Sequence, residues 1–484
     1  LRVAFLLPSL LAGLLTLWLV YDLGRRLWSP RIGLYAAAAL FVCLQFGLQA
    51  KRGQIDMVLV ALTTLSLWGI LLHLLRGPDW RALAIGGFAA GLGTVTKGVG
   101  FLPLLLLLPW LAVPAATRNK TAGGWRWTTL PMAFVLGAGV WLGPMLFAVA
   151  ASEDPALRSY AHEILFRQTA ERYANPWGHH NPPWYFLQVI ATLWLPGALL
   201  LPWLLPAWWR RLRRRQPATL LLVGWALLVL LFFSASPGKR EVYILPALPA
   251  LCLAAAPLLP GLLKRIGVRL ALLAHVLLFA TVALLVAGSG LVGSGEWIQR
   301  KAAARDIAAA DLRALLYWML ALGLGSFAIA AATRLRRAAP GTVLFTALLW
   351  TVYGVGLLPA IDASSSAKAV MQKVGRHIGP DAELAVLAWR EQHLLQADRP
   401  ARDFGFRRPW HEQWQDAGAW LAADPGKRWL FVLDEALSPC VDRAQAVAIG
   451  RSNRRDWLLL PGTAWPGDCV TPPFAADDLG HAPR

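Results

Sequence analysis

Charged side chains are scarce in this chain of 484 residues. They make up 15% of the sequence, whereas a soluble domain usually carries about a quarter. Apolar residues account for 57%, and the mean hydropathy is +0.49. These values exclude a soluble globular enzyme and a disordered chain. The apolar stretches recur in blocks of roughly 20 residues, the length that crosses a bilayer as a helix, without the alternation of barrel strands. The class that remains is a polytopic membrane protein, an all-α bundle.

Acidic residues are fewer still. The chain has 27 Asp and Glu against 47 Lys and Arg, a formal charge of +20. Such a charge can indicate a nucleic-acid partner. Here the Lys and Arg lie mainly in short loops between apolar blocks, where they set membrane topology. The sequence therefore predicts no nucleic-acid partner.

Several motifs that carry known chemistry are also missing. The sequence has no P-loop, no dinucleotide fingerprint, no Cys-pair metal motif, no nucleophile elbow and no internal repeat. It has only four cysteines. Cys43 and Cys252 fall in apolar blocks and are best read as packing residues, whereas Cys440 and Cys469 fall in the C-terminal part of the chain.

The apolar blocks, bounded by charges or by Pro and Gly, predict twelve membrane spans. We place them near residues 3–23, 32–50, 55–75, 82–96, 99–116, 127–150, 184–209, 217–236, 242–262, 269–290, 312–333 and 341–360.

Every second loop between these spans is basic and almost free of acids, so these loops are predicted to be cytoplasmic. Their basic residues are Arg25, Arg26, Arg31; Arg76, Arg81; Arg118, Lys120, Arg126; Arg210, Arg211, Arg213, Arg214, Arg215; Lys264, Arg265, Arg269; and Arg334, Arg336, Arg337. The same alternation places the N-terminus outside. Since the chain opens with Leu1 rather than Met, we expect an upstream span, so that the chain would begin at the second helix of a thirteen-helix protein.

The loops on the opposite side are longer and chemically mixed. Residues 151–183 contain a helix start at Ser152-Glu153-Asp154-Pro155, followed by apolar residues at helical spacing. This pattern predicts an interfacial helix, and residues 296–311 are expected to form a second one.

The composition changes after about residue 361. A capped helix at 365–378, a strand at 384–389, a helix near 411–422 and strands at 429–433 and 457–460 predict a small α/β domain. We therefore divide the chain into a transmembrane domain, 1–360, which includes the loop 151–183, and an extracytoplasmic α/β domain, 361–484. A disulfide between Cys440 and Cys469 could persist in that compartment.

Most polar groups at the span ends are predicted to gather on the extracytoplasmic side. They are Lys51, Arg52, Gln54, Asp56; Lys97; Glu171, Arg172, His179, His180, Asn181; and Lys239, Arg240, Glu241, Tyr243. An ionisable group at the membrane is costly and suggests function. The alternative for each is structural: snorkelling anchors for the cations, a helix-dipole partner for Asp56, ordinary loop histidines, and a belt aromatic for Tyr243.

Taken together, these groups favour a site for a phosphate. Several cations with a tyrosine hydroxyl suit an anionic oxygen cluster, and a nearby acid can act as a base or orient an acceptor. Because no nucleotide-binding loop is present, a lipid phosphate that enters from the bilayer is the simplest substrate.

Four segments then resemble a known family, the polyprenyl-phosphate-dependent glycosyltransferases of GT-C type, and within it the bacterial aminoarabinose (lipid A) transferase and protein O-mannosyltransferase group. The segments are Gln54-Ile55-Asp56; Leu92-Gly93-Thr94-Val95-Thr96-Lys97-Gly98-Val99-Gly100-Phe101; His180-Asn181-Pro182-Pro183-Trp184-Tyr185-Phe186; and Ser236-Pro237-Gly238-Lys239-Arg240-Glu241-Val242-Tyr243-Ile244-Leu245-Pro246-Ala247-Leu248-Pro249. The resemblance runs from residue 1 to about 260. Beyond that point the chain agrees with the family only in having more spans and a periplasmic α/β domain.

The resemblance implies an inverting transfer of a sugar from a polyprenyl (undecaprenyl) phosphate to a periplasmic-side acceptor, such as a lipid A phosphate, at the bacterial inner membrane. Asp56 would be the catalytic carboxylate, and His179 or His180 would contact the acceptor or a divalent metal ion. The donor phosphate would be bound by Arg172, Lys239, Tyr243 and Lys97. In that family the principal acids and a phosphate-binding Lys lie in the first periplasmic loop, which the resemblance implies would precede Leu1.

Two other functions stay open. A protein O-mannosyltransferase would use the same site on a Ser or Thr hydroxyl, and a lipid-linked substrate transporter or flippase would also be polytopic and basic. Transporters place ionisable groups near the bilayer midplane, often in repeated halves. This chain is predicted to have them at one face and shows no repeat, which favours the enzyme.

Overall fold

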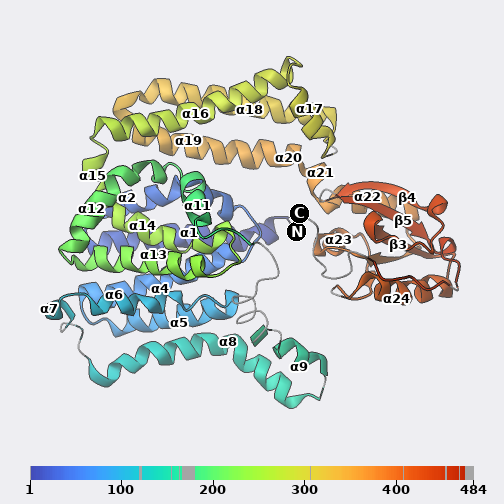
Figure 1. The fold of residues 1–484 in the computed structure, drawn as a ribbon, viewed down its shortest axis with the longest axis horizontal. Coiled ribbons are helices and arrows are strands. Elements are labelled where there is room, and N and C mark those ends of the chain that lie inside the picture. The colour runs from blue at the N-terminus through green and yellow to red at the C-terminus, as the bar shows by residue number, and fades with distance from the viewer. Residues whose placement is uncertain are drawn as a thin grey trace. The chain divides into compact units, whose positions relative to one another are not determined.

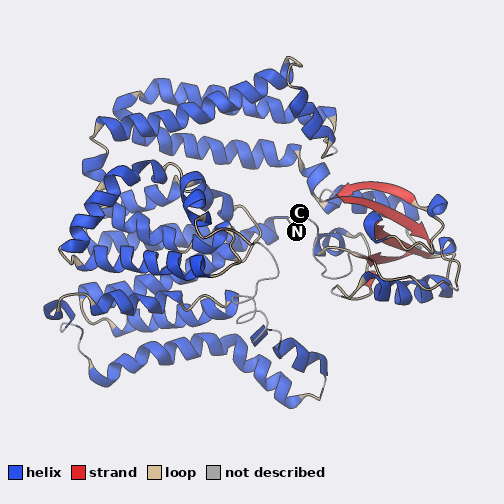
Figure 2. Cartoon of the chain, viewed as in Figure 1, coloured by secondary structure: helices blue, strands red, loops and turns tan. Residues whose placement is uncertain are grey.

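The computed structural model describes residues 2–474, except 119, 120, 122, 154, 163, 166–179, 306, 407, 453, 454 and 468. The chain forms two compact units. The first comprises Leu1–Leu278 and Ser326–Ala347, and the second comprises Phe279–Gly325 and Leu348–Arg484. Figure 1 follows the chain from blue to red, and Figure 2 shows that strands are confined to its C-terminal part.

The first unit is helical. Its elements are α1 (Arg2–Leu27), α2 (Pro30–Phe41), α3 (Leu44–Ala50), α4 (Asp56–Arg76), α5 (Trp80–Lys97), η1 (Leu102–Leu106), α6 (Leu107–Leu111), α7 (Ala115–Arg118), η3 (Gly124–Thr128), α8 (Thr129–Ala151), α9 (Pro155–His162), α11 (Tyr185–Leu193), η5 (Gly197–Leu200), α12 (Leu201–Arg213), α13 (Pro217–Ala235), η6 (Glu241–Ile244), α14 (Ala247–Ala255) and α15 (Leu259–Leu262). Three later helices contribute residues to both units: α16 (Ile266–Leu291), α18 (Ala309–Thr333) and α19 (Ala338–Val352).

Among the described residues, seven helices are long and apolar enough to cross a membrane, and two bent helix pairs bring the number to nine. The bent pairs are α2 with α3, at 74°, and α11 with η5 and α12, at 100°. They replace the straight spans expected at 32–50 and 184–209. The expected span 82–96 is α5, a helix of 18 residues that is rich in glycine.

The remaining two expected spans are wrong as single helices. Residues 99–116 form the short helices η1, α6 and α7, and residues 242–262 form η6, α14 and α15. The first stretch contains Pro103, Pro109 and Pro114, and the second contains four prolines. A proline inside a helix removes a backbone donor and clashes with the preceding turn, so each stretch breaks into pieces.

Close helix packing fixes the ends of α4 and α5 relative to each other. Gly69 of α4 lies against α5, where an added Cβ would be 2.2 Å from the carbonyl oxygen of Ala82. Such an approach is open only to glycine at this position. The two helices are consecutive and antiparallel, so the start of α4 and the end of α5 meet at the same end of the bundle.

The sheet of the second unit has five strands: β1 (Glu383–Leu387), β2 (Ala401–Asp403), β3 (Arg428–Leu433), β4 (Val447–Ser452) and β5 (Arg455–Pro461), in the order β2-β1-β3-β5-β4. β1 pairs in parallel with β2 and β3, while β5 is antiparallel to both β3 and β4. Helices α22 (Ala367–Ile378) and α23 (Glu391–Gln396) pack together, and α24 (Trp410–Ala423) covers β1 and β3 (Figure 1).

The expected α/β domain is therefore present, with three elements that the sequence reading did not contain: β2, α23 and β4. The expected interfacial helix 296–311 is shorter. α17 covers Glu296–Ala303, and residues 309–311 already belong to α18. The short helix α9, Pro155–His162, lies in the region of the other expected interfacial helix.

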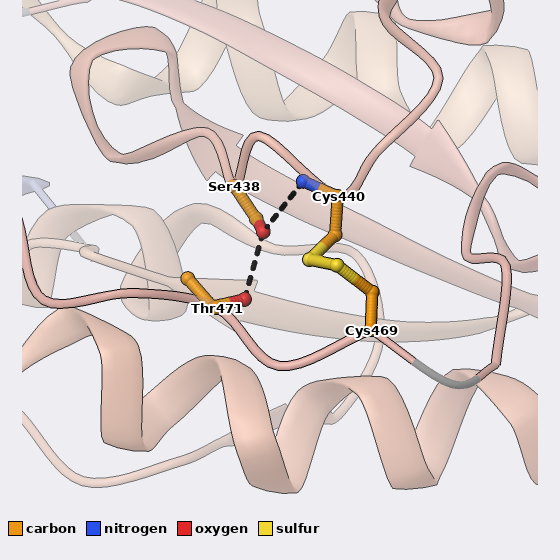
Figure 3. Close-up of a disulfide and its surroundings, with 4 residues drawn as sticks. All are labelled: Ser438, Cys440, Cys469 and Thr471. Atoms are coloured by element: carbon orange, nitrogen blue, oxygen red, sulfur yellow. Dashed lines mark hydrogen bonds between the residues drawn. A yellow bond between two sulfur atoms is a disulfide. The ribbon is translucent and has the colours of Figure 1, made fainter.

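The two cysteines of this domain form a disulfide, Cys440–Cys469, as the sequence suggested (Figure 3). The Ser438 hydroxyl lies beside it, accepts a hydrogen bond from the Cys440 amide at 3.1 Å, and is 2.7 Å from the Thr471 hydroxyl. The bond joins the loop after β3 to the segment that follows β5. Cys43 and Cys252 are buried and free, as expected for packing residues.

Candidate active site at one end of the helical bundle

Asp56 and Lys97 form an ion pair where α4 begins and α5 ends. The Lys97 ammonium donates a hydrogen bond to Oδ1 of Asp56. The Asp56 side chain is 13% exposed and that of Lys97 is 26% exposed. An acid at a helix N-terminus and a base at a C-terminus both complement the helix dipole, so local structure favours this placement. Gly98, at φ 58°, ends α5 directly after the lysine.

Tyr243 joins this pair from a third segment. The Lys97 ammonium lies 5.4 Å from the centroid of the Tyr243 ring, within the range of a cation–π contact. The Phe233 ring of α13 packs against the Tyr243 ring, with 5.2 Å between the ring centroids. The structure therefore brings together three predicted site residues, Asp56, Lys97 and Tyr243. We call these three residues the ion-pair cluster.

Lys239 connects two loops near this cluster. Its side chain is 3% exposed, and its ammonium donates to the carbonyl oxygens of Ser236 at 2.6 Å and Asn181 at 3.1 Å. The Asn181 amide donates back to the Lys239 carbonyl at 3.0 Å. These bonds hold the 180–181 loop against the segment that leads to Tyr243. The assignment of Lys239 to the donor phosphate stays a prediction.

His180 is exposed and pairs through its backbone with Gly238 in an isolated antiparallel bridge. Arg172, His179 and Glu171 lie outside the described residues, so their predicted roles stay predictions. Among the residues that the structure describes, no three His, Cys, Asp or Glu side chains come together as a metal site would require.

A network of amides adjoins the ion-pair cluster. Gln45 of α3 is 2% exposed. Its amide nitrogen donates to the Glu241 carbonyl at 2.7 Å, and its amide oxygen accepts from the Trp194 indole at 2.6 Å. One turn later Gln49, 1% exposed, donates to the Gln54 side chain at 2.8 Å. These contacts tie α3 to the segments that carry Tyr243 and Asp56.

The network borders a pocket of about 300 Å³ between α3, α11 and η6. Its polar lining residues include Gln45, Gln49, Arg52, Tyr185, Gln188 and Glu241. We call it the amide pocket. The sequence reading singled out Arg52 and Glu241 but missed Gln45 and Gln49. Two amides spaced four residues apart in an otherwise apolar helix were the available signal.

A second carboxylate, that of Asp22, lies toward the other end of the same bundle. It is 2% exposed and accepts hydrogen bonds from Arg25, from Arg26 at 2.5 Å and from the Trp68 indole at 2.9 Å. α1 and α4 run in parallel, since the Ser9 hydroxyl binds the Gln54 carbonyl at one end and Arg76 binds the Arg26 carbonyl at the other. Asp22 is not among the site residues predicted from the sequence.

Known proteins resemble this chain in sequence and in fold. Residues 2–142 match the family model described as dolichyl-phosphate-mannose-protein mannosyltransferase. The undecaprenyl phosphate-alpha-4-amino-4-deoxy-L-arabinose arabinosyl transferase 2 of Sodalis glossinidius is 32% identical over 302 residues, which cover 59% of this chain and 52% of the relative. The corresponding transferase of Pseudomonas aeruginosa is 34% identical over 261 residues, 51% of this chain and 44% of the relative. The chain thus spans about half the length of these curated relatives.

Two solved structures share the fold. The crystal structure of ArnT from Cupriavidus metallidurans bound to undecaprenyl phosphate has a TM-score of 0.67 and 20% identity, covering 94% of this chain and 83% of that chain. Its apo state has a TM-score of 0.68 and 19% identity, covering 95% and 84%. These findings confirm the predicted resemblance to the aminoarabinose transferase group and the predicted fold, a GT-C-like multi-pass membrane bundle with a small C-terminal α/β domain.

Proposed function

We propose that this chain is a glycosyltransferase of the bacterial inner membrane that moves 4-amino-4-deoxy-L-arabinose from undecaprenyl phosphate to a lipid A phosphate. The observation that carries the proposal is the ion-pair cluster at one end of the helical bundle, with an ammonium, a phenol and a carboxylate side by side. The relatives that are named for this reaction support the choice of sugar and lipid carrier.

In the proposed reaction, an oxygen of the acceptor attacks the anomeric carbon of the sugar. The bond between that carbon and the donor phosphate oxygen breaks, and undecaprenyl phosphate leaves with the electron pair. Negative charge grows on the leaving phosphate as the bond breaks. Donors that are already in place stabilise that charge best, and Lys97 and the Tyr243 hydroxyl would take this role, with Arg172 as a further predicted donor.

Asp56 would position the acceptor. A lipid A phosphate is already anionic, so it needs orientation more than deprotonation. The ion pair with Lys97 holds the carboxylate at the start of α4, where it would lie next to the donor phosphate. Lys97 would then contact both groups and limit the repulsion between them.

The remaining predicted residues have supporting roles in this proposal. Lys239 would complete the phosphate site while its bonds to Ser236 and Asn181 keep the loops in place. His179 or His180 would contact the acceptor or a divalent metal ion, as the family resemblance implies.

We further propose that the cluster and the C-terminal α/β domain face the periplasm. The predicted cytoplasmic loops contribute Arg25, Arg26 and Arg76, which lie at the opposite end of the bundle from Asp56. The Cys440–Cys469 disulfide fits an oxidising compartment. Alkaline phosphatase fused after residue 365 should be active and a fluorescent protein at the same position should be dark. The opposite pattern would place the domain in the cytoplasm.

A protein O-mannosyltransferase is the second candidate, because residues 2–142 match that family model. Its acceptor would be a Ser or Thr hydroxyl, and Asp56 would then have to remove a proton. A flippase would move the lipid-linked sugar without breaking the phosphate bond.

One experiment separates the three candidates. The protein is reconstituted with undecaprenyl phosphate-aminoarabinose and either lipid A or a Ser/Thr-rich peptide. The products are then identified by mass spectrometry. The proposal predicts lipid A enlarged by one aminoarabinose and free undecaprenyl phosphate. A glycosylated peptide would support the second candidate, and translocation of intact donor without product would support a flippase.

A further inference from the structure

The amide pocket differs chemically from the ion-pair cluster beside it. Its walls present amides and hydroxyls from Gln45, Gln49, Tyr185 and Gln188, which are neutral groups that both donate and accept hydrogen bonds. The volume of about 300 Å³ lies at the lower end of the range for small-molecule sites. These neutral groups suit the hydroxyls of a small polar ring, and the charged lining residues are one cation, Arg52, and one carboxylate, Glu241.

The two buried glutamines in this pocket do different things. Gln45 donates to the Glu241 carbonyl and accepts from the Trp194 indole, so both groups of its amide are bonded and it holds these two segments together. Gln49 donates to Gln54, and its amide oxygen has no partner among the described residues. This oxygen is not among the fully buried atoms that lack a partner, so it is accessible from the pocket that Gln49 lines. An accessible amide oxygen with spare acceptor capacity is a candidate contact for a ligand.

Glu241 brings a negative charge to the pocket, and Arg52 brings a positive one. The Nη1 atom of Arg52 is 3.8 Å from the Glu241 carboxylate, too far for a hydrogen bond. The carboxylate side chain is 33% exposed, so it can still accept bonds from a ligand. Asp56, by contrast, is already bonded to Lys97.

The pocket and the cluster share two short segments. Glu241 precedes Tyr243 by two residues, and Arg52 precedes Asp56 by four. A donor whose phosphate lies at Lys97 and Tyr243 would thus have its sugar next to the amide pocket.

We infer that the amide pocket binds the sugar ring of the donor, that the Glu241 carboxylate accepts hydrogen bonds from a protonated amino group on that ring, and that the Gln49 amide oxygen accepts one from a ring hydroxyl. This inference rests on the proposed function and adds to it the basis of sugar selection. Gln45, which touches no substrate, is a positioning residue that holds Glu241 through its main chain.

The test compares three lipids in nanodiscs: undecaprenyl phosphate, undecaprenyl phosphate-aminoarabinose, and the same donor with a hydroxyl in place of the amine. Affinity is measured by native mass spectrometry for the parent, Glu241→Gln, Gln49→Leu and, as a control, Glu296→Gln. Glu296 is an exposed glutamate on α17 with no ion pair among the described residues.

The parent and the control should bind the amino donor about tenfold more tightly than the hydroxyl donor, the size expected for a hydrogen bond to a charged group. Glu241→Gln should abolish that preference, and Gln49→Leu should weaken both sugar-bearing donors several-fold. Neither change should alter the affinity for undecaprenyl phosphate alone.

Other results have distinct meanings. If both variants retain the parent's affinities for all three lipids, the inference is overturned while the proposed function stands. If both variants lose undecaprenyl phosphate itself, the pocket belongs to the phosphate and the inference is again overturned. If the parent binds none of the three lipids, the proposed function fails and the inference fails with it.

Discussion

The two ends of the helical bundle each contain a carboxylate paired with cations, but the two pairs are built differently. Asp22 is 2% exposed and bonded to Arg25, Arg26 and the Trp68 indole. Asp56 is 13% exposed and accepts one hydrogen bond among the described residues, from Lys97, whose ammonium also lies over the Tyr243 ring.

The number of protein donors explains the difference. A carboxylate can accept about four hydrogen bonds. At Asp22 the protein supplies three donors and closes the group off from solvent, so its contribution is structural. At Asp56 most of the acceptor capacity is left for a ligand. For these two carboxylates, the acceptor capacity that the protein leaves unused distinguishes a candidate site from a structural ion pair.

The largest expected effect comes from Asp56→Asn. Loss of the negative charge should lower the rate of sugar transfer by about a hundredfold, or ~3 kcal/mol in the activation barrier. The loss should be larger if the acceptor is a hydroxyl, which must give up a proton, than if it is a phosphate. Thermal melting should change little, because the pair is partly exposed.

Tyr243→Phe is the matched test on the donor side of the cluster. It keeps the ring beside Lys97 and removes only the hydroxyl. Turnover should fall while the melting temperature stays the same. If both variants turn over donor within about twofold of the parent, the assigned site is wrong.

Asp22→Asn should produce the opposite pattern. Arg25, Arg26 and Trp68 would lose their charged acceptor in a nearly closed site, at a cost of about 2 kcal/mol in the free energy of unfolding. Melting in detergent and abundance in the membrane should drop, while the protein that remains folded keeps its turnover per molecule. A selective loss of turnover at normal stability would contradict the structural role of Asp22.

In the C-terminal domain, a buried histidine should give a smaller effect, on stability and not on turnover. His393 is fully buried between Phe431 and Trp457, with ring centroids 5.3 and 4.2 Å away. Burial, which disfavours the charged form, lowers the pKa of His393 from 6.5 to about 4. The unfolded chain therefore binds this proton more readily than the folded domain. The contribution of the neutral histidine to the free energy of unfolding is complete above about pH 6.5 and is lost as the pH falls toward 4.

At pH 5.5 the loss in the free energy of unfolding should be about 1 kcal/mol relative to neutral pH. Hydrogen exchange of the β1 and β5 amides in the whole protein measures it. His393→Phe should remove this part of the pH dependence without affecting transfer. An unchanged pH profile in the variant would show that another group is responsible.

The sequence predicted the architecture because its signals are strong and local. Three patterns arise from large free energies of burial or solvation. They are the long apolar blocks, the basic loops, and the change from helical to strand periodicity near residue 361. The helix breaks at 99–116 and 242–262 could have been predicted from their prolines. β2 was missed because a strand of three residues has too short a pattern to detect.

The site was predicted only in part. Asp56, Lys97 and Tyr243 stood out because each is polar at the end of an apolar block, and the structure brings them together. Gln45 and Asp22 were missed because their roles depend on partners far away in sequence, Glu241 for the first and Trp68 for the second. No local sequence pattern shows whether a distant partner uses the hydrogen-bonding capacity of a polar side chain or leaves it available to a ligand.

The most direct test of the account maps the phosphate of the donor onto the bundle. An undecaprenyl phosphate analogue with a photoreactive group beside the phosphate is crosslinked to the protein in nanodiscs, and labelled peptides are identified by mass spectrometry. The account predicts labels in residues 92–101 and 236–245, around Lys97 and Tyr243. Labels concentrated at residues 22–31 and 76–81 would contradict it, because they would show that the lipid follows the basic residues near Asp22 and not the open cluster at Asp56.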